Sequence, residues 1–339
     1  MHKLLAIGDH FITPSLMRAR ITSRVGDTVE IQEASTPFPL EPFRDVAEVK
    51  EASGSEEETI EALRGAALCV AHHAPFTKKV LQACPELRLL VICRGGPVNV
   101  NVPAASEAGV LVGFTPGRNA TATAEFSVAM ALAAVRRIPA TDSGIRRGEW
   151  PGNYTFETVG FELEGATCGV IGFGEIGRRV ARILQGFGAS VLVYDPYPEI
   201  SDEEHVENVS LAELLRRSQL VSLHARETAE TRGLIGGNEI ALMPKGSVLV
   251  NCARGKLLDY AALEEALRSG HLFAAAADVF PEEPLPPQSS LLTLPNFVLT
   301  PHIAGGSGQA AEKACRIAAE EVERFLRGEA LRYCANPRP

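Results

Sequence analysis

The stretch Cys168–Gly177, which reads CGVIGFGEIG, decides the fold of this 339-residue chain. Its first four residues are typical of a buried strand, and a helical pattern follows it as far as Phe187. Between strand and helix, the first glycine allows a tight turn, the second lets backbone approach a pyrophosphate, and the third lets helix and strand pack closely. The free N–H groups at the helix start attract negative charge. The stretch predicts a dinucleotide-binding loop whose contacts are Gly172, Gly174, Glu175, Ile176 and Gly177.

An acidic residue follows the next strand pattern. Asp195 ends the run Val193-Tyr194-Asp195, about 20 residues beyond the glycine loop. A carboxylate at this place hydrogen-bonds the ribose hydroxyls of the adenosine half and repels a 2′-phosphate. Asp195 therefore predicts NAD rather than NADP as the cofactor.

On both sides of this stretch, short apolar segments alternate with amphipathic ones, a pattern typical of parallel α/β layers. Strands are expected at 4–7, 29–32, 67–71, 89–92, 110–112, 168–171, 190–194, 220–223, 247–251, 273–277 and 297–300. Helices are expected at 56–64, 79–83, 122–137, 176–187, 211–216, 260–268 and 309–327. The prediction is an α/β protein with two Rossmann-like, doubly wound parallel sheets and a cleft between the two domains.

The chain length exceeds that of one ordinary domain, so two domains are expected. The helix at 309–327 follows the last strand and is predicted to cross back to the first domain. We therefore expect a discontinuous substrate-binding domain, 1–115 plus 304–335, and an NAD-binding Rossmann domain, 116–303. The apolar helix at 122–137 is predicted to be buried between the domains or in a dimer interface. Trp150 is predicted to be a packing or hinge residue.

Composition narrows the function classes. The formal net charge is -9 with both signs mixed, which argues against a nucleic-acid partner. The seven cysteines form neither a CxxC pair nor a metal-type cluster, so we expect no metal and a reduced, cytoplasmic protein. The start of the chain does not resemble a signal peptide, and no apolar run is long enough to span a bilayer, so no membrane association is expected.

Three polar residues follow the late strands. Arg254, Glu283 and His302 come after the strands expected at 247–251, 273–277 and 297–300. In an open α/β sheet these strand ends face the ligand crevice. Arginine binds a carboxylate through two parallel hydrogen bonds, histidine exchanges a proton near neutral pH, and a carboxylate partner keeps that histidine protonated. The three residues predict a catalytic site for an anionic substrate.

At these residues the sequence resembles the D-isomer-specific 2-hydroxyacid dehydrogenase family, over most of its length. The blocks that carry the resemblance are Gly169–Gly177, Asn251–Gly255, Asp278–Pro284 and Thr300–Ile303. It implies hydride transfer between NAD(H) and C2 of a small D-2-hydroxy acid or 2-oxo acid, of the glyoxylate/hydroxypyruvate or sugar-acid type. His302 would exchange a proton with the C2 oxygen, Glu283 would stabilise the protonated His302, and Arg254 would bind the substrate carboxylate.

The resemblance also implies further contacts. Asp278 would orient the nicotinamide carboxamide, and the other expected cofactor contacts are His224, Thr228, Cys252, Ala253 and His302. Arg226 replaces the proline that is usual between His224 and Thr228, and a basic residue there would suit a phosphorylated cofactor, although we expect Asp195 to outweigh it. On the substrate side, Gly95 and Gly96 would offer backbone N–H groups to the carboxylate. Arg94, His73 and Asn119 are further candidates, with Arg94 as a surface charge and His73 as a solvated histidine as alternatives.

Other functions stay open at this point. Phosphoglycerate dehydrogenase is the nearest rival, although the short segment after the last expected helix leaves no room for an appended regulatory domain. Formate dehydrogenase would require glutamine in place of Glu283. An NAD(H)-sensing, corepressor-like binding protein would keep the same fold and much of the same site. The resemblance also implies a homodimer, the usual assembly in this family. The identity of the 2-hydroxy acid and the physiological direction cannot be inferred from the sequence.

Overall fold

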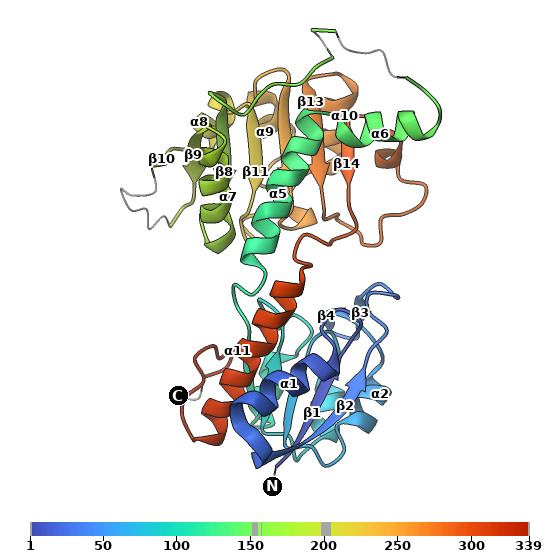
Figure 1. Cartoon of the computed structure of the whole chain (residues 1–339), viewed down its shortest axis with the longest axis vertical. Coiled ribbons are helices and arrows are strands. Elements are labelled where there is room, and N and C mark those ends of the chain that lie inside the picture. Colours follow the sequence, from blue (N-terminus) through green and yellow to red (C-terminus); the bar gives the residue numbers. More distant parts are fainter. Residues whose placement is uncertain (1, 151–154, 157, 198–204, 338–339) are drawn as a thin grey trace. The chain divides into compact units, whose positions relative to one another are not determined.

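The computed structural model describes residues 2–150, 155–156, 158–197 and 205–337. The chain divides into two compact units. Unit 1 comprises Met1–Asn119 and Gly306–Pro339, and unit 2 comprises Ala120–Gly305. The C-terminal helix α11 (Gly308–Leu326) packs against α1 (Pro14–Val25) in unit 1, although it follows the last strand of unit 2 (Figure 1).

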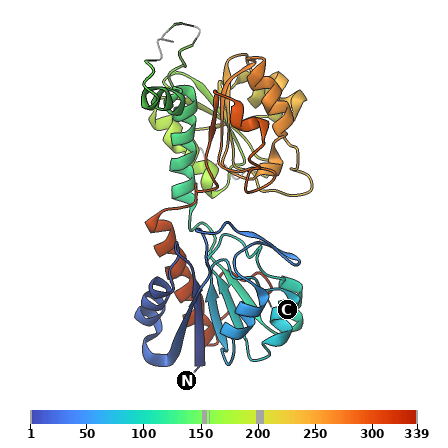
Figure 2. The same cartoon turned by 90° about the vertical axis from the view of Figure 1, so that its right-hand side faces the viewer.

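Within the described residues, unit 1 is built on a five-stranded parallel sheet in the order β2-β1-β5-β6-β7. Its strands are β1 (His2–Gly8), β2 (Val29–Ser35), β5 (Leu68–Ala71), β6 (Leu89–Ile92) and β7 (Leu111–Phe114). Helices α1 and α11 cover one face, and α2 (Glu56–Ala62), α3 (Lys78–Ala83) and α4 (Val102–Glu107) cover the other (Figure 2). A short antiparallel pair, β3 (Arg44–Val46) and β4 (Val49–Ala52), is separate.

Unit 2 is built on a seven-stranded parallel sheet, counted over the described residues, in the order β10-β9-β8-β11-β12-β13-β14. Its strands are β8 (Thr167–Ile171), β9 (Ser190–Tyr194), β10 (Glu207–Asn208), β11 (Leu220–Leu223), β12 (Ser247–Asn251), β13 (Leu272–Ala277) and β14 (Phe297–Leu299). Helices α5 (Ala120–Val135) and α7 (Glu175–Gly186) cover one face. Helices α8 (Leu211–Arg217), α9 (Gly237–Leu242) and α10 (Tyr260–Arg268) cover the other. Figure 2 shows the two layers, with α6 (Ile138–Arg146) beyond α5.

The inner strands of each sheet are buried on both faces because they are predominantly apolar, whereas the edge strands β2 and β10 carry exposed polar side chains. In β5, Leu68 and Val70 pack under α1 and α11, whereas Cys69 and Ala71 pack toward α2 and α3. Side chains alternate between the two faces of a strand, so a continuous apolar run places one layer of core on each side. The carboxyl ends of the parallel strands then lie along one edge of each sheet, where loops can carry polar side chains without breaking the core.

The predicted α/β class with two parallel sheets is confirmed, and the predicted strands are present with bounds that differ by at most a few residues. The helix expected at 122–137 ends earlier, at Val135, because Arg137 adopts a left-handed φ of 53° and the chain turns into α6. The packing role expected for Trp150 is wrong, since this side chain is 88% exposed. In the described part of the chain, no helix has the length and apolar character needed to cross a membrane.

Candidate active site

The phosphate loop joins β8 to α7. Gly172 has a φ of 93°, and a Cβ there would lie 2.5 Å from the backbone nitrogen of Ala225. A Cβ on Gly177 would lie 2.0 Å from the carbonyl oxygen of Gly172. Gly174 is the N-cap of α7, receives no side-chain cap, and has nothing within 4 Å of where a Cβ would stand. The outer glycines are therefore required by packing, and the middle one leaves open space beside the helix N-terminus. These residues fit a dinucleotide pyrophosphate.

Asp195 follows β9 and is tied to the same loop. Its Oδ2 accepts a hydrogen bond from the backbone N–H of Phe173 at 2.7 Å, and its Oδ1 accepts one from Tyr197 at 2.9 Å. The carboxylate is thus held beside the phosphate loop by backbone donors. The side chain of Glu175 forms an ion pair at 2.7 Å with Arg179, one turn along α7. Ile176, half-buried, packs against the core between the sheet and α7.

The site in unit 2 continues at the end of β12. The buried Asn251 accepts a hydrogen bond from Ala253 N–H at 3.1 Å and donates one to the carbonyl oxygen of Arg254 at 2.9 Å. Cys252, which follows Asn251 in the sequence, is buried. Gly255 packs so closely under Phe280 that a Cβ on Gly255 would lie 2.1 Å from the backbone of Phe280. The backbone of Arg254 is therefore fixed, whereas its side chain is exposed and donates only to the carbonyl of Ala253, at 2.7 Å, among the described residues.

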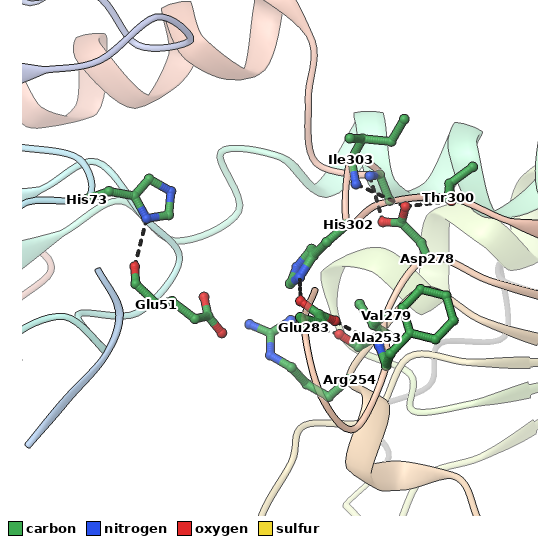
Figure 3. Close-up of polar contacts among 12 residues, drawn as sticks. Glu51, His73, Ala253, Arg254, Asp278, Val279, Glu283, Thr300, His302 and Ile303 are labelled. Atoms are coloured by element: carbon green, nitrogen blue, oxygen red, sulfur yellow. Dashed lines mark hydrogen bonds and ion pairs between the residues drawn. The ribbon is translucent and has the colours of Figure 1, made fainter. Parts of the chain in front are cut away.

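His302 and Glu283 lie in direct contact. Nδ1 of His302 is 2.7 Å from Oε2 of Glu283, and Oε1 of the same carboxylate accepts the backbone N–H of Phe280 at 2.8 Å (Figure 3). The two side chains are 26% and 20% exposed. Because Nδ1 is engaged with the carboxylate, Nε2 is the nitrogen that can exchange a proton with a ligand. Of the adjacent pair Glu282 and Glu283, it is Glu283 that contacts the histidine.

Asp278 holds the loop that carries His302. Its Oδ1 accepts hydrogen bonds from Thr300 Oγ1 at 2.6 Å and from Ile303 N–H at 2.9 Å, and its Oδ2 accepts one from Ala304 N–H at 2.7 Å (Figure 3). Burial raises the pKa of Asp278 above its ordinary value, and these hydrogen bonds oppose that shift. His302 itself has a left-handed φ of 55°. The anchoring of this loop, including the part that Thr300 plays, was not anticipated from the sequence.

Tyr260 and Asn251 are further residues that sequence reasoning missed. The Tyr260 hydroxyl donates to the carbonyl oxygen of Val279 and lies 3.4 Å from Asn251 Nδ2. These contacts connect the end of β12, which carries Arg254, to the end of β13, which carries Asp278. A polar Asn251 at the end of an otherwise apolar buried strand was the available signal.

The predicted substrate residues lie at the carboxyl ends of strands in unit 1. His73 follows β5 and is 5% exposed, and Arg94 follows β6 and is 8% exposed. Arg94 Nη1 donates to the carbonyl oxygen of Glu51 at 2.9 Å and lies 3.1 Å from His73 Nδ1, and its Nη2 pairs with the Glu51 carboxylate. His73 Nδ1 lies 2.8 Å from the same carbonyl oxygen (Figure 3). Neither residue is a solvated surface group, so the alternatives of a loop histidine in water and a surface arginine are wrong.

The neighbouring glycines and Asn119 are less enclosed. Nothing lies within 4 Å of where a Cβ of Gly95 or Gly96 would stand, so backbone there is accessible to a ligand. Asn119 is half-buried directly before α5. In unit 2, Thr228 is exposed, and its N–H donates to Thr231 Oγ1 at 2.8 Å.

Comparisons with known proteins identify the family of this chain. Residues 128–304 match the family model of the D-isomer specific 2-hydroxyacid dehydrogenase, NAD binding domain. The chain belongs to this family. It is 39% identical over 299 residues to a D-3-phosphoglycerate dehydrogenase of Methanocaldococcus jannaschii, covering 87% of this chain and 56% of that protein. It is 41% identical over 256 residues to a glyoxylate reductase of Aeropyrum pernix, covering 74% and 76%.

The fold is also similar to that of a solved structure. A glyoxylate reductase from Paecilomyes thermophila superimposes with a TM-score of 0.78 at 28% identity and covers 98% of both chains. The chain spans little more than half the length of the phosphoglycerate dehydrogenases it matches. The matched segment lies within unit 2, so unit 2 contains the part of the chain that corresponds to the NAD-binding domain of this family.

The phosphate loop offers a direct test of the cofactor site. Gly174→Ala is expected to weaken NADH binding by about tenfold or more, because the methyl group would enter the space where backbone approaches the pyrophosphate. The melting temperature should change little, since nothing lies within 4 Å of the added atom. NADH fluorescence titration and thermal unfolding measure the two effects. Gly186→Ala, in equally open space at the end of α7, is the control and should leave NADH affinity unchanged.

His224 predicts an acid-sensitive stability. Its Nε2 lies 2.8 Å from Ser222 Oγ, Nδ1 is buried without a partner among the described residues, and burial lowers the pKa of His224 to about 3. The unfolded chain, with an imidazole pKa of about 6.5, then binds more protons below that pH. The stabilisation is complete above pH 6.5 and is lost as the pH falls toward 3, by about 1–2 kcal/mol at pH 5.

The measurement is urea unfolding between pH 5 and 8 for the wild type and for His224→Gln. Burial also lowers the pKa of His72 and His73, which adds to the acid sensitivity, and raises the pKa of Asp9 and Asp278, which opposes it. These groups are common to both proteins, so the difference isolates His224. An equal pH slope in the two proteins would contradict the assignment.

Proposed function

We propose that this chain is an NAD-dependent dehydrogenase that transfers hydride between NAD(H) and C2 of a small D-2-hydroxy acid or 2-oxo acid, of the glyoxylate/hydroxypyruvate or sugar-acid type. The observation that carries the proposal is the contact of His302 with Glu283 at 2.7 Å, in the same unit as the phosphate loop and Arg254. A histidine paired with a carboxylate at the carboxyl edge of a nucleotide-binding sheet is a proton-transfer device beside a cofactor site.

The residues divide the chemistry between them. When bound, the reduced nicotinamide supplies the hydride that C2 of the 2-oxo acid receives. His302 donates its Nε2 proton to the C2 oxygen during reduction and removes it during oxidation. Glu283 stabilises the imidazolium and fixes the ring through Nδ1. Arg254 binds the substrate carboxylate and stabilises negative charge that develops on the C2 oxygen.

The cofactor would be held by residues of unit 2. The loop from Gly172 to Gly177 would bind the pyrophosphate through backbone N–H groups, and Asp195 would accept hydrogen bonds from the adenosine ribose. Besides anchoring the loop of His302, Asp278 would orient the nicotinamide carboxamide. The remaining contacts that we propose are those of Glu175, Ile176, His224, Thr228, Cys252, Ala253 and His302.

On the substrate side, Gly95 and Gly96 would offer backbone N–H groups to the carboxylate, and Asn119 would contact the substrate or the nicotinamide. We propose that His73 and Arg94 shape the binding surface together, since both are buried and both contact Glu51. We therefore propose that unit 1 is the substrate-binding domain.

The test is NADH consumption by the purified protein with glyoxylate, hydroxypyruvate, pyruvate, phenylpyruvate and sugar-derived 2-oxo acids, with NADPH in parallel. Turnover with NADH in preference to NADPH is expected, and the rank order of kcat/KM describes the substrate. NADH binding without turnover of any of these acids, together with NADH-dependent capture of a protein partner, would replace this function by that of a cofactor-sensing binding protein.

Phosphoglycerate dehydrogenase is the second candidate, because relatives of that name match 87% and 85% of this chain. Adding 3-phosphohydroxypyruvate to the panel decides between the two. A kcat/KM for this acid far above that for hydroxypyruvate would make it the substrate.

We also propose a homodimer that forms through the surface of α6 and the described residues between α6 and Gly160. The large apolar side chains exposed there are Ile138, Ile145, Trp150, Phe156 and Val159. Exposed apolar side chains gathered on one region favour association. Light scattering should then give about twice the chain mass of 36.3 kDa. A single chain mass at micromolar concentration would reject the dimer.

We propose the cytoplasm as the place where the chain works. All seven cysteines lie in the described part of the chain, all are free, and six are buried. Disulfides are rare in reducing compartments, so unpaired cysteines throughout favour such a compartment. Fractionation of the source cells with an antibody to the chain would test this.

A further inference from the structure

Arg118 occupies a fixed place at the carboxyl edge of the sheet in unit 1. It lies in the loop after β7, where Thr115 donates through its N–H and its Oγ1 to the carbonyl oxygen of Arg94, at 2.8 and 3.2 Å. Lys313 of α11 donates to the carbonyl oxygen of Gly117 at 2.7 Å. The loop that carries Arg118 is therefore joined to the loop of Arg94, Gly95 and Gly96, and its backbone is held on both sides.

The guanidinium of Arg118 lacks a partner. No described residue accepts a hydrogen bond from it or forms an ion pair with it, and its Nε and Nη1 atoms are buried. Burial, followed by repulsion from Arg94, lowers the pKa of Arg118 to about 10, so the group is still a cation at neutral pH. A buried charged donor without an acceptor is unfavourable, and such groups are normally paired.

The acidic groups nearby are already engaged. Asp9 accepts hydrogen bonds from Phe11 N–H at 2.9 Å and Ile12 N–H at 2.8 Å through Oδ1, and its Oδ2 lies 2.5 Å from His72 Nδ1. The Glu51 carboxylate pairs with Arg94. Asp9 attracts Arg118 without bonding to it. Of these two arginines, Arg94 is satisfied by the protein, whereas the buried Nε and Nη1 of Arg118 have no acceptor among the described residues.

We propose that Arg118 binds a second anionic group of the substrate, a carboxylate or a phosphate at the end remote from the C2 carbon. A guanidinium donates hydrogen bonds to the oxygens of either group. Its loop adjoins Gly95 and Gly96, the backbone expected to bind the first carboxylate. The inference rests on the proposed function and narrows it: the preferred 2-oxo acid carries two anionic groups.

The experiment compares pairs of acids that differ by one anionic group. Pyruvate is paired with oxaloacetate, and hydroxypyruvate with 3-phosphohydroxypyruvate, which separates carboxylate from phosphate. The wild-type enzyme should show, in one pair, at least a tenfold higher kcat/KM for the acid that carries the second anionic group. Arg118→Gln should remove that preference through KM and leave kcat/KM for the other acid of the pair within about threefold. Arg118→Lys, which keeps the charge and guards against a folding defect in the glutamine variant, should retain part of it.

The matched control is Arg88→Gln. Arg88 lies at the opposite end of β6, is exposed, and donates to the carbonyl oxygens of Pro85 and Leu87. This variant removes the same charge from the same unit and should keep the preference for the acid with the second anionic group. No preference in the wild type, or an equal loss for both members of a pair in Arg118→Gln, would overturn the proposal.

Failure of the dehydrogenase function itself is distinguishable. If the wild type binds NADH but reduces none of the four acids, calorimetric titration with malonate and with inorganic phosphate tests Arg118 directly. Binding of either anion by the wild type and its loss in Arg118→Gln would support an anion site at Arg118. Equal binding by both proteins, or none by either, would refute it.

Discussion

His302→Ala is expected to lower kcat for reduction of the preferred 2-oxo acid by about 10³–10⁴-fold, near the upper end of what a general acid contributes. The variant removes the only described imidazole in contact with Glu283, so the C2 oxygen would have to take its proton from water. NADH affinity should change by less than about threefold, because the phosphate loop and Asp195 are untouched. Steady-state kinetics and NADH fluorescence titration measure the two quantities.

Two variants sharpen this result. Glu283→Gln keeps an acceptor for Phe280 N–H but removes the charge beside His302, and a smaller loss of about 10–10²-fold is expected. His2→Ala, at an exposed histidine at the start of β1, should leave kcat unchanged. If His302→Ala weakened NADH binding as much as it lowered kcat, the main role of His302 would be cofactor binding rather than proton donation.

The parallel sheets could be predicted because inner strands such as β5, β6 and β13 are buried and read as continuous apolar runs. The phosphate loop could be predicted as well, since Gly172 and Gly177 stand where the Cβ of any other residue would collide with backbone. Residues at the carboxyl ends of strands in one sheet, such as Arg254 after β12 and His302 after β14, could be placed on one edge by topology alone.

The burial and the hydrogen-bond partners of the polar side chains could not be predicted. Arg94 and His73 are buried because Glu51, from a strand pair far away in sequence, supplies the ion pair and the carbonyl oxygen that they share. The role of Asp278 in anchoring the loop of His302 depends on three donors that lie 22–26 residues further along the chain. Such contacts are set by tertiary packing, and no local pattern in the sequence encodes them.

Arg254→Lys is expected to lower kcat/KM by about 10²–10³-fold, although the charge is conserved. The backbone of Arg254 is fixed by Asn251 and by the close packing of Gly255 under Phe280, so the side chain cannot shift to bring a shorter ammonium to the same place. A lysine presents one point charge, whereas the guanidinium binds the carboxylate through two parallel hydrogen bonds and reaches the C2 oxygen as well.

The division of this loss between KM and kcat identifies what Arg254 does. Carboxylate binding alone would raise KM for the 2-oxo acid and leave kcat nearly unchanged, whereas stabilisation of charge on the C2 oxygen would lower kcat too. We expect both parameters to change, with unaltered NADH affinity. Lys256→Arg, which adds a guanidinium at an exposed residue two positions away, should have no effect on either parameter and should not rescue Arg254→Lys. Wild-type kinetics in Arg254→Lys would show that the substrate carboxylate is bound elsewhere.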